Sequence, residues 1–249
     1  MTQWKDKCKA FLLDIVFPNR CPFCNGFIVW DAYVCPECAD KLQDANAQIC
    51  RKCGYQKCIC NDENEDIVYD MVLSPFFFHD DGVRDAIYRF KHIGDTNIAD
   101  LAAENIVRYM KNEGIPDPDI IVPVPMDKRK QTMRGHNQAE LFARCIGKRL
   151  DVPVDSKILF KNRNNSSEQH TLSREERREH VKELFFAGFA NRGNTDLNGQ
   201  TVMLCDDVMT TGSTLNECAG LLKKLGAVKV ITAVCAVTEL ENTSDEEGA

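Results

Sequence analysis

The chain has 249 residues, of which 43% are hydrophobic and 28% are charged, and its formal net charge is −7. This composition predicts one large globular domain with a small additional module, and the negative charge argues against general attraction to nucleic acid. No apolar run approaches the roughly 20 residues of a membrane-spanning helix, so we expect no membrane insertion. Because no export signal is evident, the 13 cysteines favour metal-bound thiolates over disulfides and indicate a cytoplasmic protein.

An amphipathic helix is expected at the start of the chain, where apolar residues between Trp4 and Val16 fall on one face before Pro18 ends the pattern. We interpret it as a core or docking helix. A helix lying on a membrane surface is the alternative, but its polar face is not strongly basic.

Eight cysteines then follow in four close pairs and predict two structural zinc sites. Two cysteines in one tight turn can reach the same ion, and two such turns complete the tetrahedron that zinc prefers. The simplest pairing places Cys21, Cys24, Cys35 and Cys38 in one site and Cys50, Cys53, Cys58 and Cys60 in the other. An interleaved pairing fits the same spacing, and redox-active cysteines are a further alternative. Four thiolates leave no open position for chemistry, so each ion is expected to stabilise a module with little core.

The acidic segment 61–66 reads as a linker, so we predict a ribbon module at 1–64, a second domain at 65–240 and an acidic tail at 241–249. Strand and helix patterns alternate in the second domain, which predicts an α/β fold with a mostly parallel sheet. Strands are expected at 68–78, 120–125, 154–160, 201–205 and 229–237. Helices are expected at 85–92, 98–110, 139–150, 172–180 and 215–225, with a loop at 162–171.

A basic segment follows the strand at 120–125 and is predicted to be a loop. The carboxyl end of a parallel strand is where an open α/β sheet binds its ligand. The candidate binding residues here are Pro125, Met126, Lys128, Arg129 and Arg134. A solvated basic face is the alternative interpretation.

The most informative stretch is 202–214, in which an apolar strand ends in Asp206 and Asp207. A short loop and a helix follow, and free N–H groups at such a helix start bind anions. Gly212 permits close approach, and further donors come from the hydroxyls of Thr210, Thr211, Ser213 and Thr214. The acids are hydrogen-bond acceptors, which suit the vicinal hydroxyls of a sugar. Together these groups predict a ribose 5-phosphate site.

Three other interpretations compete for this stretch. A nucleotide-binding strand of the P-loop type requires a G-x-x-x-x-G-K-[ST] loop, which the sequence lacks. An ordinary helix cap and a plain turn do not explain why two acids, a glycine and four hydroxyls coincide. Because neighbouring side chains on a strand point to opposite faces, we expect the strand to end at Cys205 and the backbone to turn between the acids.

These motifs in this order resemble the ComF family, in which a double zinc ribbon is fused to a type I phosphoribosyltransferase domain. The resemblance covers nearly the whole chain, and residues 202–214 resemble the phosphoribosyl-pyrophosphate (PRPP) motif. It also rests on the cysteine pairs and on segments 89–95, 123–125, 134–138 and 169–173 with Arg177. It implies an α/β fold with a mostly parallel sheet flanked by helices. His136 and His180 depart from the family's usual residues.

The resemblance implies that Asp206 and Asp207 bind the ribose hydroxyls of PRPP, with magnesium, while Thr210 to Thr214 surround the 5-phosphate. Cationic side chains would neutralise the pyrophosphate, and closure of 169–178 would exclude water. The residues expected to act in catalysis are Asp206, Asp207, Lys128 and Arg177; Pro125, Met126, Arg129 and Arg134 complete the expected ligand site.

The same resemblance implies phosphoribosyl transfer to an acceptor, in the context of bacterial DNA uptake and its proteins. A regulatory protein that senses PRPP without catalysis is one alternative. An adaptor that binds single-stranded DNA is another, because residues 127–149 carry seven Lys or Arg against two acids.

Overall fold

The computed structural model of the protein describes residues 18–58, 60, 67–80, 82–161, 185–187 and 196–238. Several predicted features lie outside these residues: the N-terminal helix, the linker 61–66, Arg177 with its loop, the helix at 172–180 and the acidic tail. Within the described residues, no helix combines the length and the apolar character needed to cross a bilayer.

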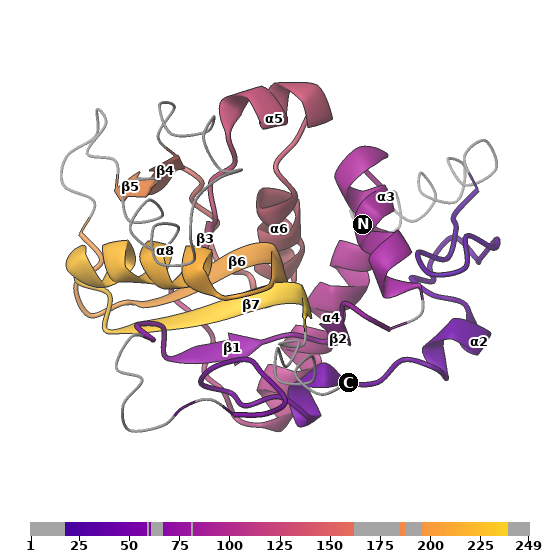
Figure 1. Ribbon diagram of the computed structural model, residues 1–249, viewed down its shortest axis with the longest axis horizontal. Helices are drawn as coiled ribbons and strands as arrows, with labels where there is room; N and C mark the ends of the chain where they lie inside the picture. The colour runs from indigo at the N-terminus through magenta and orange to yellow at the C-terminus, as the bar shows by residue number, and fades with distance from the viewer. Residues whose placement is uncertain are drawn as a thin grey trace, which may run out of the picture.

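Five parallel strands form the central sheet (Figure 1). They are β1 (Met71–Leu73), β2 (Phe76–Phe77), β3 (Ile120–Pro123), β6 (Thr201–Met209) and β7 (Lys229–Val237). The order is β1-β7-β6-β3, and β2 pairs with β7 beyond the end of β1. The central strands β6 and β7 are mostly buried, as expected for apolar strands covered on both faces. The predicted parallel sheet is confirmed.

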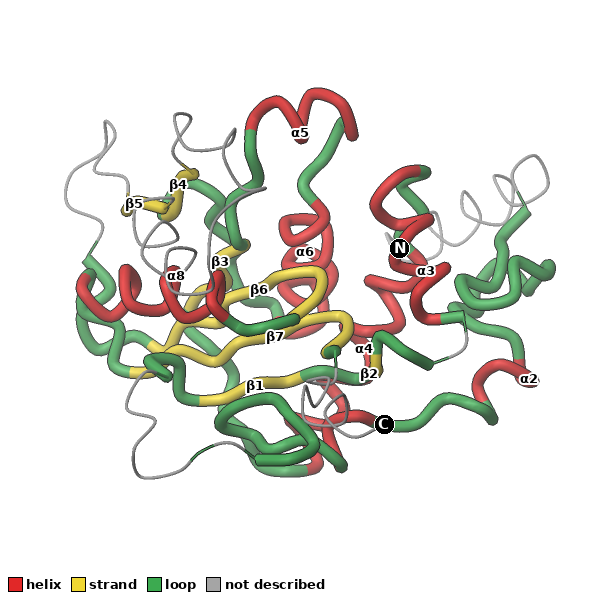
Figure 2. Tube along the Cα trace, in the orientation of Figure 1, coloured by secondary structure: helices red, strands yellow, loops and turns green. Residues whose placement is uncertain are grey.

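Helices cover both faces of this sheet (Figure 2). On one side lie α3 (Val83–His92), α4 (Asn97–Asn112) and α6 (Gln138–Leu150), and on the other lies α8 (Ser213–Lys224). The alternation of β6 matches these layers: Met203 and Cys205 belong to the hydrophobic cluster of α4 and α6, whereas Val202 and Leu204 belong to that of α8. The sheet is therefore buried between two separate cores.

The strand predicted at 154–160 is wrong. Val154 forms only an isolated bridge with Ile121, and the chain then turns because the Asp155 carboxylate accepts the N–H of Lys157 at 2.8 Å. A later strand, β4 (Leu159–Lys161), pairs antiparallel with β5 (Phe185–Ala187), outside the main sheet.

The basic segment after β3 is a helix, α5 (Lys128–Arg134), and not the predicted loop. Asp127 caps it, because its carboxylate accepts the N–H of Arg129 at 2.8 Å and that of Lys130 at 3.3 Å. Gly135, with a φ of 80°, ends the helix, and Asn137 caps α6. Arg134 is therefore the last residue of α5.

Two cysteine-rich segments, the first ribbon around residues 21–38 and the second around residues 50–60, form hydrogen bonds with the domain that contains the central sheet. They contain a short helix, α2 (Pro36–Ala39), and the 3₁₀ helix η1 (Ala45–Ala47). The Asn97 amide of α4 donates to the Asn19 side chain at 2.6 Å, which holds the first ribbon. The N–H of Val72 in β1 donates to the carbonyl of Arg51 at 2.7 Å, which holds the second.

Ribbon residues also belong to both cores. Cys21 and Phe23 pack in the cluster of α4 and α6, while Cys53 and Tyr55 pack in the cluster of α8. The ribbons are thus parts of the same hydrophobic cores and not a module attached by a linker alone. The predicted boundaries after residues 64 and 240 stay predictions.

Candidate functional site

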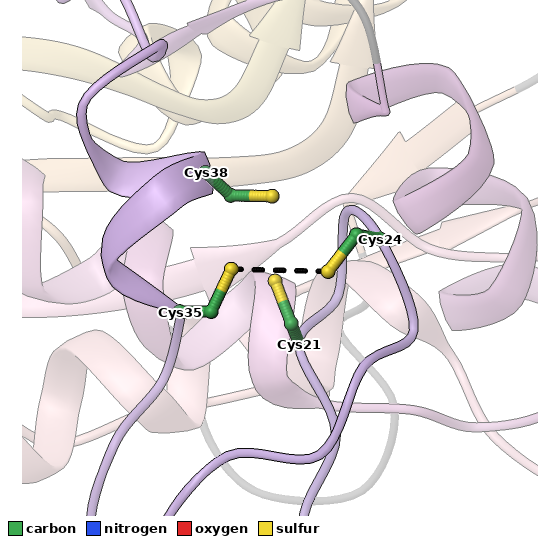
Figure 3. Close-up of side chains that lie close together, drawn as sticks. All are labelled: Cys21, Cys24, Cys35 and Cys38. Carbon is green, nitrogen blue, oxygen red and sulfur yellow. Dashed lines mark hydrogen bonds between the residues drawn. The ribbon is translucent and has the colours of Figure 1, made fainter.

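The first cysteine cluster joins two turns of the first ribbon (Figure 3). Cys21, Cys24, Cys35 and Cys38 place their Sγ atoms within 4.8 Å of one another. Cys21 and Cys24 meet because the Asn25 N–H donates to the Cys21 carbonyl at 2.9 Å, with Asn25 in the left-handed region. Asn tolerates that conformation better than most residues.

The second cluster repeats this construction in the second ribbon. Cys50, Cys53, Cys58 and Cys60 also lie within 4.8 Å of one another. Here Gly54, with a φ of 79°, donates its N–H to the Cys50 carbonyl at 2.7 Å, so glycine takes the place that Asn25 has in the first ribbon. The structure groups the eight cysteines in the simplest predicted pairing and not in the interleaved one.

Both clusters fit zinc. Four Zn–S bonds of about 2.3 Å in a tetrahedron place the sulfur atoms about 3.8 Å apart. The Sγ–Sγ distance is 3.8 Å between Cys24 and Cys35 and also between Cys50 and Cys60. Burial opposes ionisation of Cys21 and Cys50, but hydrogen bonds with the neighbouring backbone lower the pKa of each thiol to about 7. Burial and the neighbouring cysteines raise the pKa of Cys38 and Cys60, so the full set of four thiolates needs the charge of a metal ion. Thiolates are the form that binds metal.

The two acids of β6 lie beyond the end of its pairing with β3. β6 is longer than predicted and stays paired with β7 as far as Met209, so the expected end at Cys205 is wrong. Pairing of β6 with β3 does stop at Cys205. Each carboxylate accepts a nearby backbone N–H: Asp206 that of Asp207 at 2.9 Å, and Asp207 that of Val208 at 2.7 Å. These local bonds give both N–H groups an acceptor.

Lys91, which the sequence analysis did not select as a site residue, contacts this acidic pair. Its Nζ lies 3.1 Å from Oδ2 of Asp207, and both side chains are largely buried. The buried Gln138 amide donates to the Lys91 carbonyl at 3.2 Å and so fixes the end of α3. Lys91 and Gln138 both fall in segments that carried the family resemblance, and that was the only signal in the sequence.

The Asp206 carboxyl is electrostatically unfavourable in its charged form. Burial and the neighbouring charge of Asp207 raise the pKa of Asp206 to about 8, although the Asp207 N–H, Lys91 and Lys161 oppose the shift. The acidic pair therefore lacks compensating positive charge even with Lys91 present.

The loop after β6 forms the start of α8 and presents donors. Gly212, with a φ of 68°, is buried, and a Cβ there would lie 3.0 Å from the Met209 side chain. In the described chain, none of the N–H groups of residues 211–215 donates to a backbone carbonyl. The hydroxyls of Thr211 and Ser213 lie 3.0 Å apart, while Thr210 and Thr214 keep part of their surface exposed. Such a loop can receive an anion.

The predicted basic residues do not join this group. Lys128, Arg129 and Arg134 lie on α5, which has no buried residue and stands beyond the end of β3 (Figure 1). Among the described residues, no ion pair or hydrogen bond links them to Asp206 or Asp207. Pro125 and Met126 lie between β3 and α5, and Arg177 is outside the described residues.

Known protein families match both parts of the chain. A family model of the double zinc ribbon domain matches residues 12–70, and one of the phosphoribosyl transferase domain matches residues 136–247. Competence protein ComFC of Bacillus subtilis is 28% identical over 213 residues, which are 82% of this chain and 83% of that protein. The chain thus carries a double zinc ribbon domain and a phosphoribosyl transferase domain, the combination that the resemblance to the ComF family implies.

Other relatives match over shorter stretches. Competence protein F of Haemophilus influenzae is 37% identical over 113 residues, which are 45% of this chain and 48% of that protein. DNA utilization protein YhgH of Salmonella typhi is 33% identical over 133 residues, or 53% of this chain and 56% of that protein. The chain thus spans about half the length of these two relatives.

Solved structures with this fold are more distant. Glutamine PRPP amidotransferase from B. subtilis is 17% identical, with a TM-score of 0.36 over 61% of this chain and 27% of that one. A purine phosphoribosyltransferase from Pyrococcus horikoshii is 23% identical, with a TM-score of 0.32 over 57% of this chain and 72% of that one. The phosphoribosyltransferase fold of the chain follows from the family model and from the parallel sheet.

Zinc removal is expected to destabilise the whole chain, because the ribbons share cores with the sheet. Elemental analysis should find about two zinc ions per chain. A strong chelator should remove both ions and lower the melting temperature of the single unfolding transition. An unchanged melting temperature after complete metal loss would contradict this expectation.

Asp206→Asn should stabilise the protein at high pH. The raised pKa means that ionising Asp206 destabilises the fold progressively as the pH rises from about 4, its unfolded value, to about 8. Asn keeps an acceptor without the charge, so the variant should melt roughly 2 to 4 °C above wild type at pH 9, about 1 kcal/mol for a protein of this size. The difference in melting temperature should be small at pH 5, where Asp206 of the folded protein is still neutral. An equal difference at both pH values would exclude the charge of Asp206 as its cause.

Proposed function

We propose that the protein binds PRPP or another ribose 5-phosphate with magnesium and transfers the phosphoribosyl group to an acceptor. The observation that carries the proposal is the adjacency of two carboxylates of β6, beyond its pairing with β3, to a loop at the start of α8 whose N–H groups donate to no backbone carbonyl of the described residues. The carboxylates accept the ribose hydroxyls, and the loop holds the 5-phosphate. This pairing suits one ligand that carries both groups.

Displacement at the anomeric carbon passes through a cationic, oxocarbenium-like state while pyrophosphate leaves. Such a reaction depends mainly on positioning and charge, and this site supplies both. Thr210 to Thr214 fix the phosphate end of the sugar. Asp206 and Asp207 fix the hydroxyl end and orient the anomeric carbon, and their negative charge favours the cation.

The donor set fits magnesium, which prefers carboxylate and phosphate oxygens. Asp206 and Asp207 would hold the ion together with ligand oxygens, and it would supply positive charge to the leaving pyrophosphate. The raised pKa of Asp206 supports this fit, because it marks an acidic pair whose negative charge Lys91 does not fully balance.

Lys91 is assigned a role in binding the leaving group. In the protein without ligand its ammonium pairs with Asp207 at 3.1 Å. When Asp207 accepts a sugar hydroxyl, the ammonium can turn to the pyrophosphate oxygens of the same ligand. Lys128, Arg129 and Arg134 on α5 remain candidates for the outer part of the pyrophosphate. Arg177, which lies outside the described residues, stays a candidate from the sequence.

A second candidate function is binding of single-stranded DNA in DNA uptake. The basic residues of α5 are solvent-exposed or half-buried, and they make no ion pair within the described residues. The names of the relatives, which refer to competence and to DNA utilization, favour the same context. In that role α5 would contact the phosphate backbone, with other DNA-uptake proteins as partners. The acidic edge of β6 favours the sugar-phosphate site as the primary function.

Replacing both acids tests the ribose assignment. Asp206→Asn with Asp207→Asn should keep the zinc content and the fold. Affinity for ribose 5-phosphate and PRPP should fall at least about tenfold, or roughly 1.4 kcal/mol, because charge-assisted hydrogen bonds are lost. Calorimetry with and without Mg²⁺ measures this loss.

Asp100→Asn is the matched control, because Asp100 pairs with Arg149 at 3.1 Å on the α4–α6 side. Wild-type affinity in the double variant would refute the ribose assignment and the transferase proposal. Release of pyrophosphate from PRPP with a panel of bases then separates catalysis from sensing.

Lys91→Met tests the leaving-group role. The variant should bind PRPP about tenfold more weakly, because one charged contact with pyrophosphate is lost, and should bind ribose 5-phosphate nearly as well as wild type. Lys223→Met is the control, since Lys223 pairs with Asp70 at 2.7 Å and has a similar exposure. Equal losses for both ligands would show that Lys91 acts on the acids and not on pyrophosphate.

A further inference from the structure

The second ribbon reaches the loop that follows β6. The Tyr55 hydroxyl donates to the Thr210 carbonyl at 3.1 Å, a contact between residues 155 positions apart in sequence. Tyr55 is 6% exposed, so water competes little for this bond. Its own carbonyl accepts the N–H of Cys50 at 2.8 Å, which ties it to the second cysteine cluster.

Packing supports the same connection. Met209 lies between two glycines: a Cβ on Gly54 of the ribbon, or on Gly212 of the loop, would lie 3.0 Å from its side chain. The same added Cβ on Gly212 would lie 3.1 Å from the Tyr69 hydroxyl, so Tyr69 also packs against the loop. Cys53, Tyr55, Tyr69 and Met209 belong to one hydrophobic cluster with Leu215 of α8. The loop therefore rests on the second ribbon.

The hydrogen bond from Tyr55 fixes the direction of one peptide group. In a planar trans peptide the carbonyl and the following N–H point in opposite directions. The Thr210 carbonyl points to the ribbon, so the Thr211 N–H points away from it. The structure describes no backbone acceptor for that N–H. The ribbon thus holds the peptide in the orientation in which its donor is free for a ligand.

We propose that Tyr55 is a positioning residue of the phosphate loop and that zinc in the second ribbon maintains this loop, an inference that rests on the ribose 5-phosphate site proposed above. The first ribbon docks on α3 and α4 through Asn19 and Arg89, away from the loop. The two zinc clusters therefore differ: both stabilise the fold, and the second also controls affinity for the phosphate group.

Tyr55→Phe tests the proposal, since it removes only the hydroxyl. Zinc content and melting temperature should stay close to wild type. Hydrogen–deuterium exchange of the peptide covering residues 209–214 should become faster, and affinity for ribose 5-phosphate in calorimetry should fall about three- to tenfold, the size expected for one neutral hydrogen bond.

Tyr109→Phe is the matched control. The Tyr109 hydroxyl joins the second ribbon to α4 by accepting from Arg51 at 3.1 Å and donating to Asn46 at 3.3 Å, but it does not contact the loop. Exchange and affinity should be unchanged in this variant. Equal effects in the two variants would overturn the specific role of Tyr55 and indicate general loosening of the ribbon.

A second comparison separates the two clusters. Cys24→Ser and Cys58→Ser each remove one exposed ligand, from the first and the second cluster respectively. Faster loop exchange and weaker ribose 5-phosphate binding are expected mainly for Cys58→Ser. If either variant does not fold, Tyr55→Phe decides alone.

The two proposals fail in different ways. Wild-type protein that binds no ribose 5-phosphate refutes the ligand site, while loop exchange in Tyr55→Phe still reports on positioning. Wild-type protein that binds the ligand, with unchanged exchange and affinity in Tyr55→Phe, refutes the positioning role alone.

Discussion

The unequal extent of the pairing of β6 with its two neighbours, β3 and β7, determines where Asp206 and Asp207 lie. β6 continues with β7 to Met209, whereas its pairing with β3 ends at Cys205. The residues beyond Cys205 have one ladder partner among the described strands, and their other side is free. A polar pair in the middle of a parallel sheet would be costly, but here it reaches the edge of the sheet and can meet a ligand. The apolar first half of β6 anchors the carboxylates of the second half.

Metal-binding turns and hydrophobic packing act together in the N-terminal part. Each ribbon has too little apolar surface to fold alone, and four thiolates around an ion can replace much of the missing core. Both ribbons also contribute side chains to the two cores of the sheet. Metal binding that stabilises the ribbons therefore also stabilises the domain that contains the sheet, because the two parts pack directly against each other.

The sequence predicted the elements whose signals are local. The cysteine pairs, the apolar strands and the stretch from Val202 to Thr214 follow from spacing and chemistry. Lys91 could not be selected, because its partner Asp207 is remote in sequence and only the packing of α3 brings them together. Tyr55 was missed for the same reason.

Predicted boundaries of helices and strands were wrong where side-chain hydrogen bonds or strand pairing set them. The basic stretch 128–134 was predicted to be a loop, but Asp127 caps it and it forms the helix α5. The strand at 154–160 is interrupted by the Asp155 turn, a side-chain effect that apolar patterning does not register. The predicted end of β6 at Cys205 is wrong because it rested on bringing two neighbouring carboxylates to one sugar, although pairing with β7 continues to Met209.

The strand order also limits when the domain can be completed during synthesis. β7 comes last in sequence among the described strands, yet it lies between β1 and β6. A nascent chain can close its cysteine-rich turns early, because they are local, but β1 must wait for a partner that emerges more than 150 residues later. The half-made chain thus carries metal-loaded ribbons beside unpaired apolar strands, a state exposed to misassembly and a natural substrate for chaperones.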